Sequence, residues 1–124
     1  ARGIDPKTIE SQGHLHDATA AGRGYAVSGG VSKAIENCIH EYYPDVEVSI
    51  EHAEGLAECK KTLTLAKAGR LNGCLIEGMG CPGGCIAGAG TNIPVLKAKK
   101  DLAAYVKNST TPIPPKELEE IELE

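Results

Sequence analysis

One glycine-rich stretch with two cysteines constrains this chain more than any other feature. It runs from Gly78 to Gly90, and six of its thirteen residues are glycine. Because glycine has no Cβ, such a turn lets the backbone approach a bulky group or adopt positive φ. Pro82 suits the first position of a short helix, which would carry Cys81 and Cys85 on one face. The positive end of that helix would favour thiolates, the form in which cysteine binds metal.

Composition narrows the class of protein. The 124 residues are enough for one domain with a modest core. A net charge of −4 and the lack of a basic patch argue against a nucleic-acid partner. There is no apolar run of membrane-spanning length and no secretory signal in the sequence. Five unevenly spaced cysteines argue against a secreted disulfide framework, so we expect a cytoplasmic protein.

Hydrophobic periodicity predicts strands and helices in alternation. Strands are expected over residues 24–27, 46–51 and 73–77. Helices are expected over residues 31–42, 56–68 and 95–107. This βαβαβα order with short connections predicts an α/β fold of three-layer type, a parallel sheet with flanking helices.

Local signals refine the expected helices. Ser28 is a plausible N-cap of the first helix, and Thr91 or Asn92 of the third. The apolar stripe of the second helix is expected to consist of Leu56, Cys59, Leu63 and Ala66.

Three regions are expected along the chain. Residues 1–22 are predicted to form an irregular N-terminal arm, residues 23–110 an α/β subdomain, and residues 111–124 a proline-rich and acidic tail. His14 and His16 in the arm are predicted to be solvated rather than metal-binding. Because the chain starts without a methionine, we expect a fragment of a longer protein or a product of proteolytic maturation.

Two glycine-containing turns each follow an expected strand. One is Ser28-Gly29-Gly30 and the other runs from Cys81 to Cys85. Ligand sites of parallel sheets form at the carboxyl ends of the strands. We therefore predict that both turns open on the same edge of the sheet.

The number of cysteines limits what this edge can bind. A structural zinc site or a cubane iron–sulfur cluster commonly takes four ligands, and the turn offers two. Cys38, Cys59 and Cys74 lie on apolar stripes or in a strand, which favours structural roles. Either the other ligands lie outside this chain, or the pair is a redox disulfide, a phosphate loop or incidental. The spacing argues against the disulfide, and the missing Lys-Ser/Thr argues against the phosphate loop.

The residues of both turns resemble a known family. Residues 76–85 resemble the last of the three cysteine motifs of iron-only ([FeFe]) hydrogenases, close to Glu-x-Met-Ala-Cys-Pro-Gly-Gly-Cys followed by glycines. Residues 22–31 are similar to the family's preceding segment, a strand that leads into a Ser/Thr-Gly-Gly-Val helix start. The resemblance covers residues 18–108. It implies the C-terminal part of the catalytic (H-cluster) domain of the large subunit.

This resemblance implies a role for each site residue. Cys81 would bind the [4Fe–4S] cubane, Cys85 would bridge the cubane to a two-iron subsite, and Met79 would pack against that subsite. Pro82, Gly83 and Gly84 would shape the turn around the cluster. Ser28, Gly29 and Gly30 would line the neighbouring wall.

The resemblance also implies what the whole protein does. The parent would interconvert protons, electrons and dihydrogen with a ferredoxin-like electron partner. Its other cubane ligands and its proton-relaying cysteine belong to two upstream motifs that this chain lacks. We therefore expect an inactive fragment without a bound cluster, with Cys81 and Cys85 as free thiols or a disulfide. Its natural partner would be the missing N-terminal part of the subunit, and its uncovered surface could form a homodimer.

Two departures from the family pattern leave alternatives open. The glycine run after Cys85 is replaced by Ala87–Thr91, and a long helix over residues 95–107 replaces a shorter ending. Such features are typical of less-studied branches with electron-bifurcating, sensory or unassigned roles. The alternatives are a dihydrogen-sensing regulatory protein, a relative that assembles cytosolic iron–sulfur proteins, and a scaffold domain with incidental cysteines.

Overall fold

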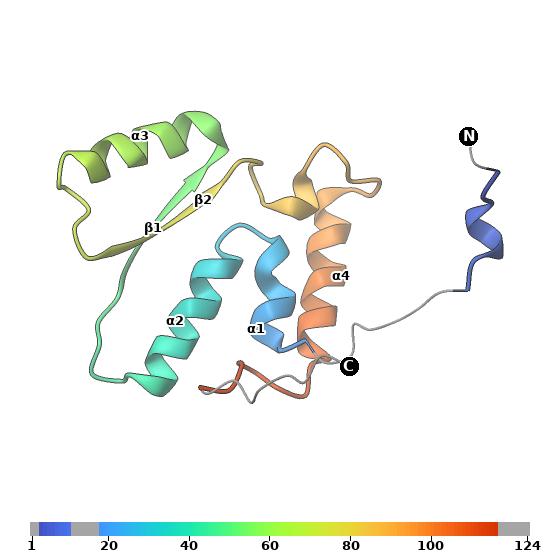
Figure 1. Cartoon of the computed structure of the whole chain (residues 1–124), viewed down its shortest axis with the longest axis horizontal. Helices are drawn as coiled ribbons and strands as arrows, with labels where there is room; N and C mark the ends of the chain where they lie inside the picture. Colours follow the sequence, from blue (N-terminus) through green and yellow to red (C-terminus); the bar gives the residue numbers. More distant parts are fainter. Residues whose placement is uncertain (1–2, 11–17, 117–124) are drawn as a thin grey trace.

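The computed structural model describes residues 3–10 and 18–116 of the chain. Figure 1 shows the elements, in which η marks a single 3-10 turn. In chain order they are η1 Pro6–Thr8, α1 Ala20–Arg23, η2 Gly24–Ala26, α2 Gly30–Tyr42, β1 Ser49–Glu54, α3 Gly55–Lys67, β2 Cys74–Met79, η3 Cys85–Ala87 and α4 Val95–Lys107. The predictions for His14, His16 and the acidic residues 117–124 lie outside the described residues.

The centre of the fold is a two-stranded parallel sheet within the described residues. β1 and β2 pair from Ser49 opposite Cys74 to Glu54 opposite Met79. The connecting helix α3 packs against both strands, and α2 contacts β2 from the other side (Figure 1). The predicted α/β class, with helices flanking a parallel sheet, is confirmed at this level.

The expected first strand, residues 24–27, is wrong. Residues 24–26 form the 3-10 turn η2, which continues directly from α1. The chain then folds back so tightly that a Cβ on Gly30 would collide with the Gly24 carbonyl oxygen. This short apolar run between glycines therefore forms a helical turn that packs against α2 and α4. Its burial does not come from a sheet, so the predicted βαβαβα order fails at its first step.

The bounds of the remaining elements differ from prediction by a few residues. β1 begins at Ser49 and not at Val46, whose side chain is half exposed. The N-caps of α2 and α4 are Gly29 and Pro94, and neither is the predicted residue. The alternation of Val46, Val48 and Ile50 belongs partly to the segment that leads into the strand.

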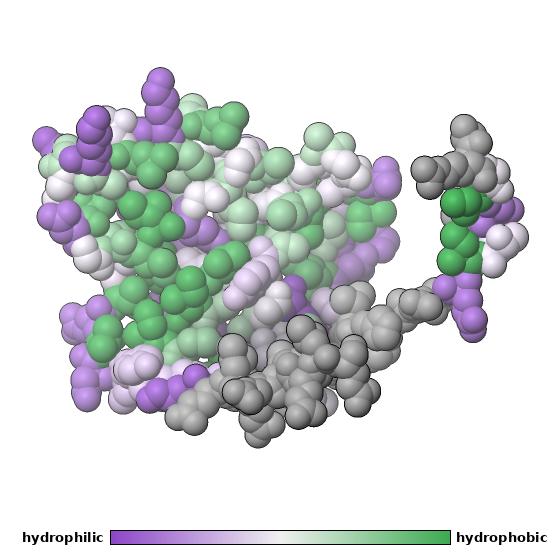
Figure 2. All heavy atoms as spheres, viewed as in Figure 1, coloured by the Kyte–Doolittle hydropathy of each residue, from purple (hydrophilic) through white to green (hydrophobic). Residues whose placement is uncertain are grey.

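Helix α3 presents a different face to the sheet from the one predicted. Thr62 is buried and Cys59 is half-buried, with its thiol 3.5 Å from the Ala53 carbonyl oxygen. In contrast, Leu56 and Leu63 are 79% and 63% exposed. The predicted stripe therefore mixed two sides of the helix. Figure 2 shows that apolar residues are widespread on the visible face of the molecule.

The segment after α4 stays bonded to the helices. The carbonyl oxygens of Thr111 and Pro112 accept hydrogen bonds from the Ala20 and Ala21 amides, at 2.8 and 2.9 Å. The Tyr42 hydroxyl donates to the Pro114 carbonyl oxygen at 2.6 Å. The boundaries of the three predicted regions stay a prediction. None of the helices in the described parts of the chain is long and apolar enough to cross a membrane.

Candidate functional site

The cysteine turn starts where β2 ends, at Met79. The Gly84 amide donates to the Cys81 carbonyl oxygen at 3.0 Å, and Gly83 and Gly84 have φ of +86° and +85°. Two successive residues with such angles cannot belong to an α-helix. The predicted helix beginning at Pro82 is therefore wrong, and only the 3-10 turn Cys85–Ala87 follows.

Both thiols of this turn are accessible. Cys81 and Cys85 are exposed and are free thiols in the structure. The Cys81 sulfur lies 3.5 Å from the position that a Cβ on Gly88 would occupy. Gly88 thus leaves room beside one thiol. The two cysteines flank the left-handed residues of the turn and do not share one helix face.

The two glycine-containing turns are in direct contact. The Ser28 amide donates to the Gly83 carbonyl oxygen at 3.3 Å. A Cβ on Gly84 would lie 2.6 Å from both the Ala26 carbonyl oxygen and the Ser28 nitrogen. The prediction that each turn follows a strand is wrong for the first turn, which follows η2, although Ser28 still contacts the cysteine turn that comes after β2.

Glu54 connects both turns to the end of β1, and the sequence analysis missed it. Its carboxylate accepts a hydrogen bond from the Gly83 amide at 2.9 Å. A hydrogen bond with the Ser28 side chain, followed by the Gly83 bond, holds the pKa of Glu54 below its ordinary value. The next residue, Gly55, would bring a Cβ to 3.6 Å from the Pro82 ring. The available signal was a carboxylate at the carboxyl end of a parallel strand.

Glu77 organises the other side of the sheet. This β2 residue is 8% exposed, and its carboxylate accepts from the Val31 amide at 3.2 Å and the Ser32 hydroxyl at 2.8 Å. His52 Nδ1 of β1 lies 3.0 Å from the same carboxylate. Burial opposes ionisation, but the hydrogen bonds outweigh it, so the pKa of Glu77 lies below its ordinary value. The carboxylate also lies at the positive end of α2, where negative charge is favoured.

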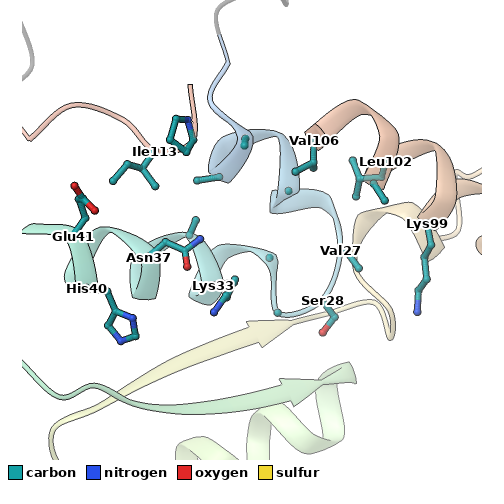
Figure 3. A pocket seen from close by; sticks show the side chains of 18 of the residues that line it. Val27, Ser28, Lys33, Asn37, His40, Glu41, Lys99, Leu102, Val106 and Ile113 are labelled. Atoms are coloured by element: carbon teal, nitrogen blue, oxygen red, sulfur yellow. The ribbon is translucent and has the colours of Figure 1, made fainter. Parts of the chain in front are cut away.

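The Ser28–Gly30 turn lines a cavity of about 990 Å³ between the helices. Figure 3 shows Lys33, Asn37 and His40 of α2 along one side and Leu102 and Val106 of α4 on the opposite side. Neither cysteine of the turn lines this cavity.

The remaining residues singled out in the sequence are half-buried. Met79 is the half-buried last residue of β2. Cys38, Cys59 and Cys74 are half-buried, which agrees with structural roles. Within residues 3–10 and 18–116, no group of three or more histidine, cysteine or acidic side chains could hold a metal ion.

The structure thus places two exposed cysteines on a glycine-containing turn directly after β2, and thiolates are the usual ligands of iron–sulfur clusters. Residues 1–89 match the family described as iron only hydrogenase large subunit, C-terminal domain, and the chain belongs to this family. No curated protein matches the chain. The match starts at residue 1, whereas the resemblance was expected to start at residue 18. The match ends at residue 89, before α4 (Val95–Lys107).

The residues present fit part of an iron–sulfur cluster. Cys81 and Cys85 are exposed thiols separated by a turn that has no bulky side chain at Gly83 or Gly84. A cubane with four thiolates needs two more, and the half-buried cysteines do not join the pair within the described residues. The chain therefore fits the role of contributing two ligands.

Proposed function

We propose that this chain is the C-terminal part of the catalytic domain of an iron-only hydrogenase and that Cys81 and Cys85 bind its active-site cluster. The observation that supports this most directly is the pair of accessible thiols on a turn that docks against the Ser28–Gly30 turn. When bound, the cluster would supply the redox-active site at which protons, electrons and dihydrogen interconvert. Cys81 would hold the cubane and Cys85 would link it to the two-iron subsite.

The other residues of the turn give the cluster room and a fixed wall. Gly88 leaves the space beside the Cys81 sulfur free of a side chain, and Gly84 lets the turn lie directly against the Ala26–Ser28 backbone. Ser28, Gly29 and Gly30 form the neighbouring wall together with Pro82. Met79, which ends β2 just before the turn, would pack its thioether against the two-iron subsite.

Two thiolates make the chain dependent on the rest of its subunit. We propose that the missing N-terminal part of the large subunit supplies the other cluster ligands and the proton relay. A ferredoxin-like protein in the cytoplasm would exchange electrons with the complete enzyme. The 124-residue chain alone is expected to evolve no dihydrogen from a reduced dye after cluster maturation, and evolution of the gas would contradict this.

Serine substitutions in the full-length parent test the ligand assignment. We expect Cys81→Ser to lower the iron content and the cubane absorbance. We expect Cys85→Ser to remove the infrared bands of iron-bound carbonyl and cyanide while part of the cubane absorbance remains. Cys38→Ser, at a half-buried cysteine outside the turn, is the matched control and should keep both signals. Wild-type iron content in both turn variants would refute the assignment and favour a scaffold with incidental cysteines.

A dihydrogen-sensing protein is the second candidate. The Ala87–Thr91 sequence after the second cysteine and the helix α4 beyond the matched residues favour it over a fast enzyme. Slow turnover in a parent fused to a PAS-like or kinase-like domain would support sensing. A parent without carbonyl and cyanide bands would instead support the relative that assembles iron–sulfur proteins.

A further inference from the structure

The carboxylate of Glu54 lies between the two glycine-containing turns. It accepts from the Gly83 amide at 2.9 Å and forms a hydrogen bond with the Ser28 side chain. Gly83 lies between the two cysteines in sequence, and Ser28 begins the opposing turn. One side chain from the end of β1 is therefore bonded to both halves of the proposed site.

This bond is better suited to fix the turn than the direct contact between the turns. The Ser28 amide reaches the Gly83 carbonyl oxygen at 3.3 Å, near the long end of the range for hydrogen bonds. An ionised carboxylate makes a shorter and stronger bond to an N–H group. Glu54 is ionised at neutral pH, and its hydrogen bonds with Ser28 and Gly83, followed by the charge of Lys99, lower its pKa further.

The orientation of the Pro82–Gly83 peptide group influences the direction in which the backbone continues toward Cys85. Gly83 and Gly84 both have positive φ, a region that glycine enters readily but in which it is not held by sterics. An external acceptor for the Gly83 N–H group removes part of this freedom. The orientation of that peptide sets how far the Cys85 thiol lies from the Cys81 thiol.

We infer that Glu54 is a positioning residue for the cysteine turn, which fixes Gly83 and so sets the relative placement of the two thiols. Any effect of Glu54 on cluster binding rests on the proposed function. The effect of Glu54 on the placement of the two thiols does not depend on that function. Glu54 contacts neither sulfur in the hydrogen bonds described, so it acts through Gly83 and Ser28.

Three variants of the 124-residue chain test the inference. Glu54→Ala removes the acceptor, Glu54→Gln keeps a neutral acceptor of the same length, and Glu51→Ala is the control on the same strand. Two quantities are measured: the exchange rate of the Gly83 amide by NMR, and the ratio of Cys85 to Cys81 alkylation by mass spectrometry. Unfolding midpoints show that each variant is folded.

We expect Glu54→Ala to speed Gly83 exchange by about tenfold, because the amide loses its acceptor. The alkylation ratio should shift beyond the difference between wild type and Glu51→Ala. Glu54→Gln should restore most of both values, which a general loss of stability would not do. If Glu54→Ala does not fold, Glu54→Met, which removes the acceptor but keeps the length of the side chain, takes its place in both measurements.

Two outcomes would overturn the inference: a Glu54→Ala chain that matches Glu51→Ala in both measurements, or a Glu54→Gln chain that behaves like Glu54→Ala. These outcomes are separate from the failure of the proposed function. That function fails if the parent keeps its cluster after Cys81 and Cys85 are replaced, whatever the thiol reactivity of the Glu54 variants.

Discussion

Gly84 is a residue of the cysteine turn at which an added side chain should not be tolerated. Its φ is +85°, and an added Cβ would lie 2.6 Å from backbone atoms of Ala26 and Ser28. Because backbone cannot move aside cheaply, Gly84→Ala should lower the free energy of unfolding by about 1–3 kcal/mol. Urea unfolding followed by circular dichroism measures this. Gly80→Ala, at a position of the same turn with open space around it, should have little effect. Equal losses in the two variants would contradict the account.

Glu77 makes the stability of the fold depend on pH. Its folded pKa lies below the ordinary 4.5, so the carboxylate contributes stability that is present above pH 4.5. This contribution is lost as the pH falls through the lower folded pKa. At pH 7, Glu77→Gln should be destabilised by about 1–3 kcal/mol, because it leaves buried donors poorly satisfied.

The difference between wild type and Glu77→Gln should therefore shrink as the pH falls. Unfolding free energies measured between pH 7 and pH 3 show this, with Glu47→Gln as the control for the loss of one charge. Curves that stay parallel over the whole range would show that the Glu77 carboxylate does not stabilise the native state.

At the scale of elements, the segment after α4 holds α1 in place. Thr111 and Pro112 accept hydrogen bonds from the first amides of α1, which have no acceptors inside their own helix. A chain that ends at residue 110 should lose roughly 1–3 kcal/mol of stability relative to one that ends at residue 116. Hydrogen exchange at the Ala20 and Ala21 amides should rise in the shorter chain only. Unchanged exchange would show that these bonds are not formed in solution.

The sequence predicted the elements unevenly, for physical reasons. The helices α2, α3 and α4 were recognised to within a few residues because their apolar residues repeat with the helical period. The strand expected at residues 24–27 failed because three apolar residues between glycines carry no period long enough to exclude a turn. The face of α3 was misjudged because buried Thr62 was not counted and exposed Leu56 was.

The site was predicted in part for a similar reason. The cysteine turn and its contact with Ser28–Gly30 follow from motifs that are local in sequence. Glu54 and Glu77 act through hydrogen bonds to residues 29 and 45–46 positions away, and no local pattern reports such a bond. The helix expected at Pro82 failed because the two glycines that follow it adopt left-handed angles.

At the scale of the whole molecule, several large apolar side chains are uncovered. Leu56, Leu63 and Leu96 are 79%, 63% and 83% exposed. Uncovered apolar surface favours association. The 124-residue chain should therefore self-associate as its concentration rises, as sedimentation velocity would show. Replacing all three with serine should reduce association and change stability by less than about 0.5 kcal/mol per site, because exposed side chains add little to folding. Unchanged association would place the contact elsewhere.

The cysteine turn is held by parts of the chain that are distant in sequence, and this fixes when it forms. Its bonds to Ser28 and Glu54 close loops of 55 and 29 residues, so their entropy cost falls late in folding. A peptide cut from residues 78–90 would lack both anchors and would sample many shapes. Under the proposed function, a cluster delivered before α2 and β1 have come together would meet two thiols that are not yet held in position. Insertion of metal should therefore follow folding and not guide it.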